Sequence, residues 1–127
     1  MDRRPNRLAE ALEYPSVEAH ARQTLGLIAL REGDLATAET HFETSRRIGE
    51  TLAEQEFAVL PRLGLAEIAR MRGNRHAAQR LARAALASAV SAKTPWQAGR
   101  CHLVLGRIEG TGVAARRHWR QAEALSG

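Results

Sequence analysis

The feature that most constrains this chain is a four-residue pattern that recurs every 40 residues. It reads Leu-Gly-Leu-Ile at 25–28, Leu-Ala-Glu-Ile at 65–68 and Leu-Gly-Arg-Ile at 105–108. On an α-helix the leucine and the isoleucine lie three positions apart on one face, beside a residue with little or no side chain. A second helix can approach such a face closely. Self-similarity at a period of this length is typical of stacked helical repeats.

A turn is expected after each copy of the pattern, at Gly33-Asp34, Gly73-Asn74 and Gly110-Thr111. Glycine adopts the left-handed conformation that ends many helices, and Asp, Asn or Thr can cap the helix that follows. The third turn comes three residues early in the 40-residue register. Each copy is therefore predicted to be a pair of antiparallel helices joined by a short turn.

The second helix of each pair carries an apolar stripe at the fifth, ninth and twelfth positions after the turn glycine. This spacing places the three residues on one helical face and predicts that they are buried. The stripe residues of the three pairs are Ala38, Phe42 and Ser45; Ala78, Ala82 and Ala85; and Ala115, Trp119 and Ala122.

The prolines help to set the helix boundaries. Pro15 and Pro95 lie 80 residues apart, and each can open a first helix at no cost in hydrogen bonds. Thr94 and Gln97 fit a capping box, whereas Pro61 predicts a kink or a broken first turn. The predicted helices span 6–13, 16–32, 35–50, 54–72, 75–92, 95–109 and 112–125.

The composition agrees with an all-α protein, because alanine and leucine dominate the 44% of hydrophobic residues and only 4% are aromatic. No apolar run approaches the roughly 20 residues needed to cross a bilayer, and residues 1–5 lack the apolar stretch of a signal peptide. A cytoplasmic location without membrane contact is therefore expected. Cys101 is the single cysteine, which excludes an internal disulfide and favours a small buried apolar residue.

The pattern Leu-Gly-x-Ile-Ala-x-x-x-Gly-Asp-x-x-x-Ala-x-x-x-Phe, from Leu25 to Phe42, resembles a tetratricopeptide repeat. The period is longer than the usual 34 residues and is similar to that of repeats in bacterial signal-transduction ATPases and large transcriptional regulators. The resemblance implies one domain over residues 1–127, an all-α right-handed superhelical stack of about three antiparallel helix pairs plus one leading helix. It also implies a regulatory scaffold that binds proteins or peptides or senses small ligands, without catalysis and without a cofactor.

In the repeats that this chain resembles, the first helices line the concave face. That resemblance implies a partner-binding groove in which apolar and charged side chains alternate, as suits a protein or peptide partner. Leu60, Leu63 and Leu103 could equally pack between helices. The predicted groove residues are Gln23, Leu27, Arg31, Leu60, Leu63, Glu67, Arg70, Arg100, Leu103 and Arg107.

A second hypothesis rests on the distribution of charge. Residues 1–63 hold 8 basic and 11 acidic side chains, whereas residues 64–127 hold 11 basic and three acidic ones, a net charge of +8. Arginines on the later second helices could attract nucleic acid or another polyanion, or could simply form a solvated outer face. The candidate anion-binding residues are Arg75, Arg80, Arg83, Arg116, Arg117 and Arg120.

Enzymatic and metal sites find no support in the sequence. The five histidines include no pair at the i, i+4 spacing of a helical zinc site, so neither metal nor cofactor is expected.

The two ends of the predicted stack of helices lead to a further expectation. Leu8 and Leu12 resemble a second helix whose first helix is missing, and no polar helix covers the last pair. These uncovered ends predict a segment of a longer protein or self-association.

Overall fold

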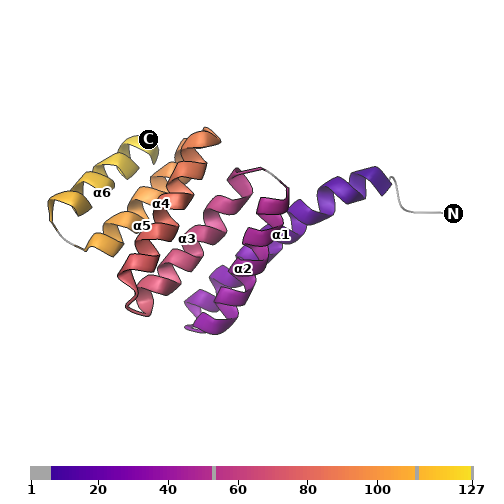
Figure 1. The fold of residues 1–127 in the computed structure, drawn as a ribbon, viewed down its shortest axis with the longest axis horizontal. Helices are drawn as coiled ribbons and strands as arrows, with labels where there is room; N and C mark the ends of the chain where they lie inside the picture. The colour runs from indigo at the N-terminus through magenta and orange to yellow at the C-terminus, as the bar shows by residue number, and fades with distance from the viewer. Residues whose placement is uncertain (1–6, 53, 111, 127) are drawn as a thin grey trace.

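The structure is a computed structural model that describes residues 7–52, 54–110 and 112–126. Its helices lie side by side in chain order, with α1 and α2 at one end of the stack and α6 at the other (Figure 1). The prediction of an all-α stack in which consecutive helices pack against each other is confirmed. The helices are α1 (Arg7–Arg31), α2 (Leu35–Thr51), α3 (Glu56–Met71), α4 (Arg75–Ser91), α5 (Pro95–Glu109) and α6 (Val113–Ser126).

The first two turns have the chemistry that the sequence predicts. Gly33 and Gly73 adopt left-handed φ angles of 81° and 82°. Asp34 and Asn74 each accept a hydrogen bond of 3.1 Å from the backbone N–H three residues later, so each caps the following helix. In the turn between α4 and α5, Lys93 takes the left-handed conformation at φ 57°. The helix ends are therefore fixed by local hydrogen bonds.

The prediction of a separate leading helix over residues 6–13 is wrong. α1 runs without interruption from Arg7 to Arg31, with Pro15 inside it. Pro15 removes one backbone hydrogen bond, but no turn residue precedes it to reverse the chain, so the helix continues. Pro61 also lies inside its helix, α3, which begins at Glu56, two residues later than predicted. The bonds that enter α3 are of the tighter i→i−3 type.

The predicted capping box at the start of α5 is also wrong. Thr94 is the N-cap residue, but its side chain makes no capping bond to the backbone. Its hydroxyl instead donates to Oε1 of Gln97 at 2.7 Å. The amide of Gln97 then donates to the backbone carbonyl of Glu56 at 3.1 Å. This pair of side chains ties the start of α5 to the start of α3.

The six helices form two layers. The odd-numbered helices contact one another, α1 with α3 and α3 with α5, in addition to their contacts with the even-numbered helices. Between the described residues, α2 makes no such contact with α4, and α4 makes none with α6. The odd-numbered helices are thus the closer set, which places them on the inner side of the curved stack.

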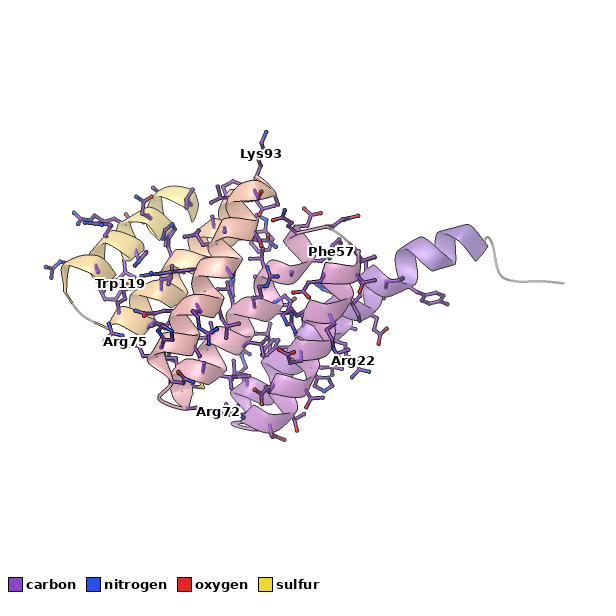
Figure 2. All side chains as sticks on the ribbon, in the orientation of Figure 1. Arg22, Phe57, Arg72, Arg75, Lys93 and Trp119 are labelled. Atoms are coloured by element: carbon purple, nitrogen blue, oxygen red, sulfur yellow. The ribbon has the colours of Figure 1, made fainter. Side chains whose placement is uncertain are left out.

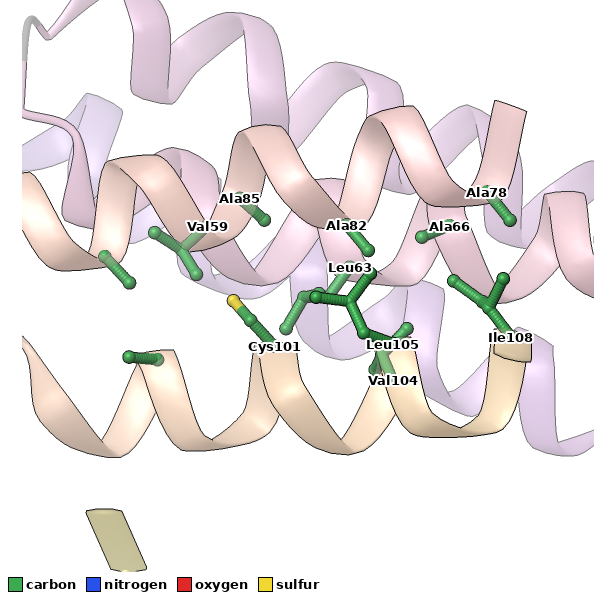
Figure 3. Packing of buried hydrophobic residues seen from close by; sticks show 12 residues of the cluster. Val59, Leu63, Ala66, Ala78, Ala82, Ala85, Cys101, Val104, Leu105 and Ile108 are labelled. Carbon is green, nitrogen blue, oxygen red and sulfur yellow. The ribbon is translucent and has the colours of Figure 1, made fainter. Parts of the chain in front are cut away.

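Each junction between successive pairs is closed by an apolar cluster. At the junction of α2 with α3, Phe42 packs with Leu65 and Ile68. At the junction of α4 with α5, a row of alanines that includes Ala82 faces Cys101 and Leu105 (Figure 3). Close approach of the helices at this second junction is possible because the alanines add little width.

Three apolar residues at the ends of the stack are exposed, although the residues at the equivalent repeat positions are buried. Leu25 is 44% exposed and Ile28 is 49% exposed, although Leu65, Ile68, Leu105 and Ile108 are all buried. Trp119, expected in the core, is 42% exposed. The physical reason is the same at both ends: within the described residues no helix precedes α1 or follows α6 in the stack.

Two histidines link α5 to α6. Nδ1 of His102 lies 2.9 Å from Nδ1 of His118, so one nitrogen must donate and the other must accept. Nε2 of His118 lies 3.3 Å from Glu109, which also faces Arg83 of α4 at 4.0 Å. Burial, and to a smaller extent the nearby His118, lower the pKa of His102 below its usual value of 6.5.

Acid is therefore expected to loosen the contact of α5 with α6. Because the folded pKa of His102 lies below the unfolded one, its contribution to stability is complete above about pH 6.5 and is lost as the pH falls toward the folded pKa. The melting temperature should drop by a few degrees between about pH 7 and pH 5. His102→Gln should flatten this part of the profile. His76→Gln, at an exposed site on α4, should leave it unchanged, and an equal slope in all three proteins would contradict the assignment.

Candidate binding groove

The three odd-numbered helices build one groove on the inner layer. It encloses about 190 Å³. Eight of the ten residues predicted for the concave face line it: Gln23, Leu27, Leu60, Leu63, Glu67, Arg100, Leu103 and Arg107. Leu30, Gly64 and Val104 complete the lining. The 40-residue register brings these side chains together because equivalent positions on successive first helices face the same way.

A buried carboxylate organises the charged part of the groove. Glu67 is 8% exposed, and its Oε2 lies 3.1 Å from Nη2 of Arg70 and 3.1 Å from Nη1 of Arg107. Glu67 therefore holds a guanidinium of α5 in position from α3. Arg107 itself is about half exposed, so its remaining donors stay open to a ligand.

Two polar atoms of this cluster have no hydrogen-bond partner among the residues that the structure describes. They are Oε1 of Glu67 and Nε of Arg70, and both are buried. Most buried polar atoms in proteins are paired, and an unpaired one costs about 1–3 kcal/mol. Both atoms belong to the ion-pair cluster around Glu67, and Glu67 lines the groove.

The leucines of the groove divide into two groups. Leu27 and Leu103 are 40% and 42% exposed, so a ligand can reach their side chains. Leu63 is 5% exposed and belongs to the core between α3, α4 and α5, and Leu60 packs against that core. For Leu60 and Leu63 the packing interpretation therefore applies, and Leu27 and Leu103 are the most exposed leucines that line the groove.

Two of the predicted groove residues do not line the cavity. Arg31 is exposed at the last residue of α1, next to the turn. Arg70 lies behind Glu67 and pairs with it. The groove lining therefore carries Arg100 and Arg107 against the single carboxylate of Glu67. Its net charge is positive, because Glu67 can neutralise only one of them.

A second cavity continues the groove toward the start of α5. It encloses about 300 Å³ and shares Gln23 and Leu60 with the first. Trp96 lines it and is 55% exposed. Sequence reasoning missed Trp96, although a signal was present: its equivalents 40 and 80 residues earlier are Glu56 and Ser16, both polar. An aromatic residue at a polar register position indicates an exposed side chain.

Another hollow, of about 590 Å³, lies between the first half of α1 and the end of α2, lined by Tyr14, Ile48 and Leu52 among others. It gathers side chains from one helix pair only.

The six arginines proposed for anion binding are all exposed on α4 and α6. Among the described residues no group of three or more His, Cys, Asp or Glu side chains is placed to hold a metal ion. None of the described helices has the length and apolar character that a membrane span requires.

The groove is thus a site of mixed chemistry. It combines two exposed leucines, two arginines and a buried carboxylate, and it extends to an exposed tryptophan. Such a lining favours recognition of a segment that carries both apolar and acidic side chains. A comparison with known proteins found no match to this chain among family models, curated proteins or solved structures.

Proposed function

We propose that the chain is a non-catalytic binding module, and that the groove of α1, α3 and α5 holds a peptide segment with aliphatic and acidic residues. One observation carries the proposal: α1 and α5 supply exposed leucines and arginines to a single groove, and the buried Glu67 of α3 holds Arg107. The tetratricopeptide resemblance of the sequence supports the same function.

The charge of the groove supports an acidic partner. Arg100 and Arg107 lie on one face of α5, seven residues apart, which is two helical turns. Leu103 lies between them and is exposed. A peptide that presents a carboxylate to each arginine and an aliphatic side chain to Leu103 and Leu27 would match this spacing. Charge-assisted hydrogen bonds from arginine to carboxylate are stronger than neutral ones.

The proposal is tested with two labelled peptides of equal length, followed by fluorescence anisotropy. One alternates leucine with glutamate, and the other alternates leucine with lysine. The glutamate peptide should bind the wild-type protein at least about tenfold more tightly, a difference of about 1.4 kcal/mol. The double variant Arg100→Gln/Arg107→Gln should lose most of that preference, since each substitution removes a donor and a charge from the groove.

The matched control is Arg75→Gln/Arg80→Gln, which removes two exposed arginines of α4 and changes the net charge equally. It should bind the glutamate peptide about as well as the wild type does. Circular dichroism would confirm that both variants are folded. Equal weakening in the two variants would show that net charge alone drives binding, and the groove would then not be the site.

A second candidate function, binding of a polyanion through the arginines of α4 and α6, is favoured by the exposure of all six side chains. Trp119 adds an exposed aromatic ring on the same helix as three of them. The same two double variants test it with a labelled single-stranded oligonucleotide in place of the peptides. The second candidate is supported if Arg100→Gln/Arg107→Gln binds the oligonucleotide as the wild type does and Arg75→Gln/Arg80→Gln binds it more weakly.

A further inference from the structure

One apolar face of α1 lies open although its counterparts are covered. Leu65 and Ile68 of α3 pack against α2, and Leu105 and Ile108 of α5 belong to the cluster that α5 forms with α4. Leu25 and Ile28 have the same residue types at the same register positions and are about half exposed. The open face of α1 is therefore built as an interface between helix pairs, and no described residue of this chain covers it.

The complementary face lies at the other end of the stack, on α6. Trp119 occupies the position of Phe42, counted from the turn glycine. Phe42 fills the space between Gly26 of its own pair and Gly64 of the next. The ring of Trp119, labelled in Figure 2, lies against Gly106 of its own pair, and the side chain is 42% exposed. The face of α6 that carries Trp119 is therefore equivalent to the face of α2 that packs against α3.

At each junction between helix pairs, the residue before the turn glycine, Gly73 or Gly110, forms an ion pair with the preceding helix. Arg72, which directly follows α3, lies 3.0 Å from Glu39 of α2, and Glu109 of α5 lies 4.0 Å from Arg83 of α4. In each pair, the residue at the end of the odd-numbered helix has one charge and its partner on the preceding even-numbered helix has the opposite charge. The equivalent residue at the first pair is Glu32, which directly follows α1, is exposed and makes no ion pair with the described residues.

The arginines of α6 have the sign that Glu32 requires. Arg116 is the sixth residue after Gly110, as Glu39 is after Gly33, and Arg120 is the tenth, as Arg83 is after Gly73. Both arginines are exposed. Stacking of α6 on α1 in the internal register would therefore place Arg116 and Arg120 beside Glu32, with the indole of Trp119 over the stripe of Leu25 and Ile28.

We propose that the open face of α1 is a docking site for α6 of a second copy of this chain, so that copies associate head to tail. The charges select this polarity, because α6 against α6 would bring the arginines of two copies together. Such a contact is heterologous and can add copies in a row. Thr24 stands where α3 has Gly64, so Trp119 packs less closely there than Phe42 does, and the association depends on concentration.

Sedimentation velocity over a range of protein concentrations tests the proposal at low ionic strength, where exposed ion pairs are least screened. The mean mass of the wild-type protein should rise with concentration. Glu32→Arg, and separately Arg116→Glu/Arg120→Glu, should each weaken association at least about tenfold. An equimolar mixture of the two variants should recover it, since each then meets an opposite charge. Arg75→Glu, outside both faces, is the matched control.

Leu25→Ser/Ile28→Ser gives a second route to the same result, because both side chains are exposed and their loss spares the core. It should also abolish association. A wild-type protein that stays monomeric at every concentration would overturn the proposal. So would charge variants that associate as the wild type does, or a mixture that fails to recover. None of these outcomes bears on the groove, which lies on a different surface.

Discussion

Phe42→Ala is expected to lower the free energy of unfolding by about 3–5 kcal/mol, the usual cost of removing a buried phenylalanine. Phe42 is fully buried, and its ring fills the gap between α1 and α3 beside Gly26 and Gly64. A loss of that size is a large part of the stability of a small domain. Urea unfolding followed by circular dichroism measures it through the shift of the transition midpoint.

A second substitution turns this result into a test of the packing. A β-carbon at Gly64 would lie 2.5–2.6 Å from three ring atoms of Phe42, so Gly64→Val alone should also be destabilising. At the next junction the equivalent residues are Ala82 and Val104, both in the core cluster. Phe42→Ala/Gly64→Val recreates that pair and should recover much of the lost stability. Strictly additive losses in the double variant would contradict a direct contact.

The same kind of substitution at Gly106 should cost less than at Gly64. A β-carbon there would meet the indole of Trp119, but Trp119 is partly exposed and can move outward.

The different burial of Phe42 and Trp119 shows which features of the fold the sequence could predict. The repeat register aligned Phe42, Ala82 and Trp119, and burial follows for Phe42 and Ala82 but not for Trp119. Register alone does not say whether a next helix is present, and burial depends on that neighbour.

Helix boundaries could be predicted where the chain carries local stop signals. α2 and α4 begin at the predicted residues, Leu35 and Arg75, because the turns at Gly33-Asp34 and Gly73-Asn74 directly precede them. α1 could not be predicted in the same way. A proline can start a helix or lie within one, and only the packing of the residues around it decides.

The groove could be predicted in outline because its residues follow one register. What could not be predicted is the partition of its leucines. Leu63 and Leu103 are equivalent by sequence, yet α5 covers Leu63 and no described helix covers Leu103. The contact of Glu67 with Arg107 could have been predicted, because the two residues lie one 40-residue period apart on neighbouring first helices. The contact of His102 with His118 could not, because no regular spacing relates these two residues.

Cys101 provides an internal reporter on the junction of α4 with α5. Its side chain is fully buried and faces the alanine row of α4 (Figure 3). Burial raises the pKa of the Cys101 thiol from 9.0 to about 12. Since the thiolate is the reactive form, this shift alone lowers the reactive fraction about a thousandfold near neutral pH.

Alkylation of Cys101 by iodoacetamide is therefore expected to be at least about a thousandfold slower in the native protein than in guanidinium, because reaction requires the junction to open. Mass spectrometry of timed samples gives both rates. The control is Ser91→Cys in a Cys101→Ala background, which places a thiol at an exposed position of α4 and should react almost as fast as the unfolded chain. Rapid native labelling of Cys101 would mean that α5 does not seal the alanine face of α4. The stacking of helix pairs, on which both the groove and the end-to-end contact depend, would then be wrong at its central junction.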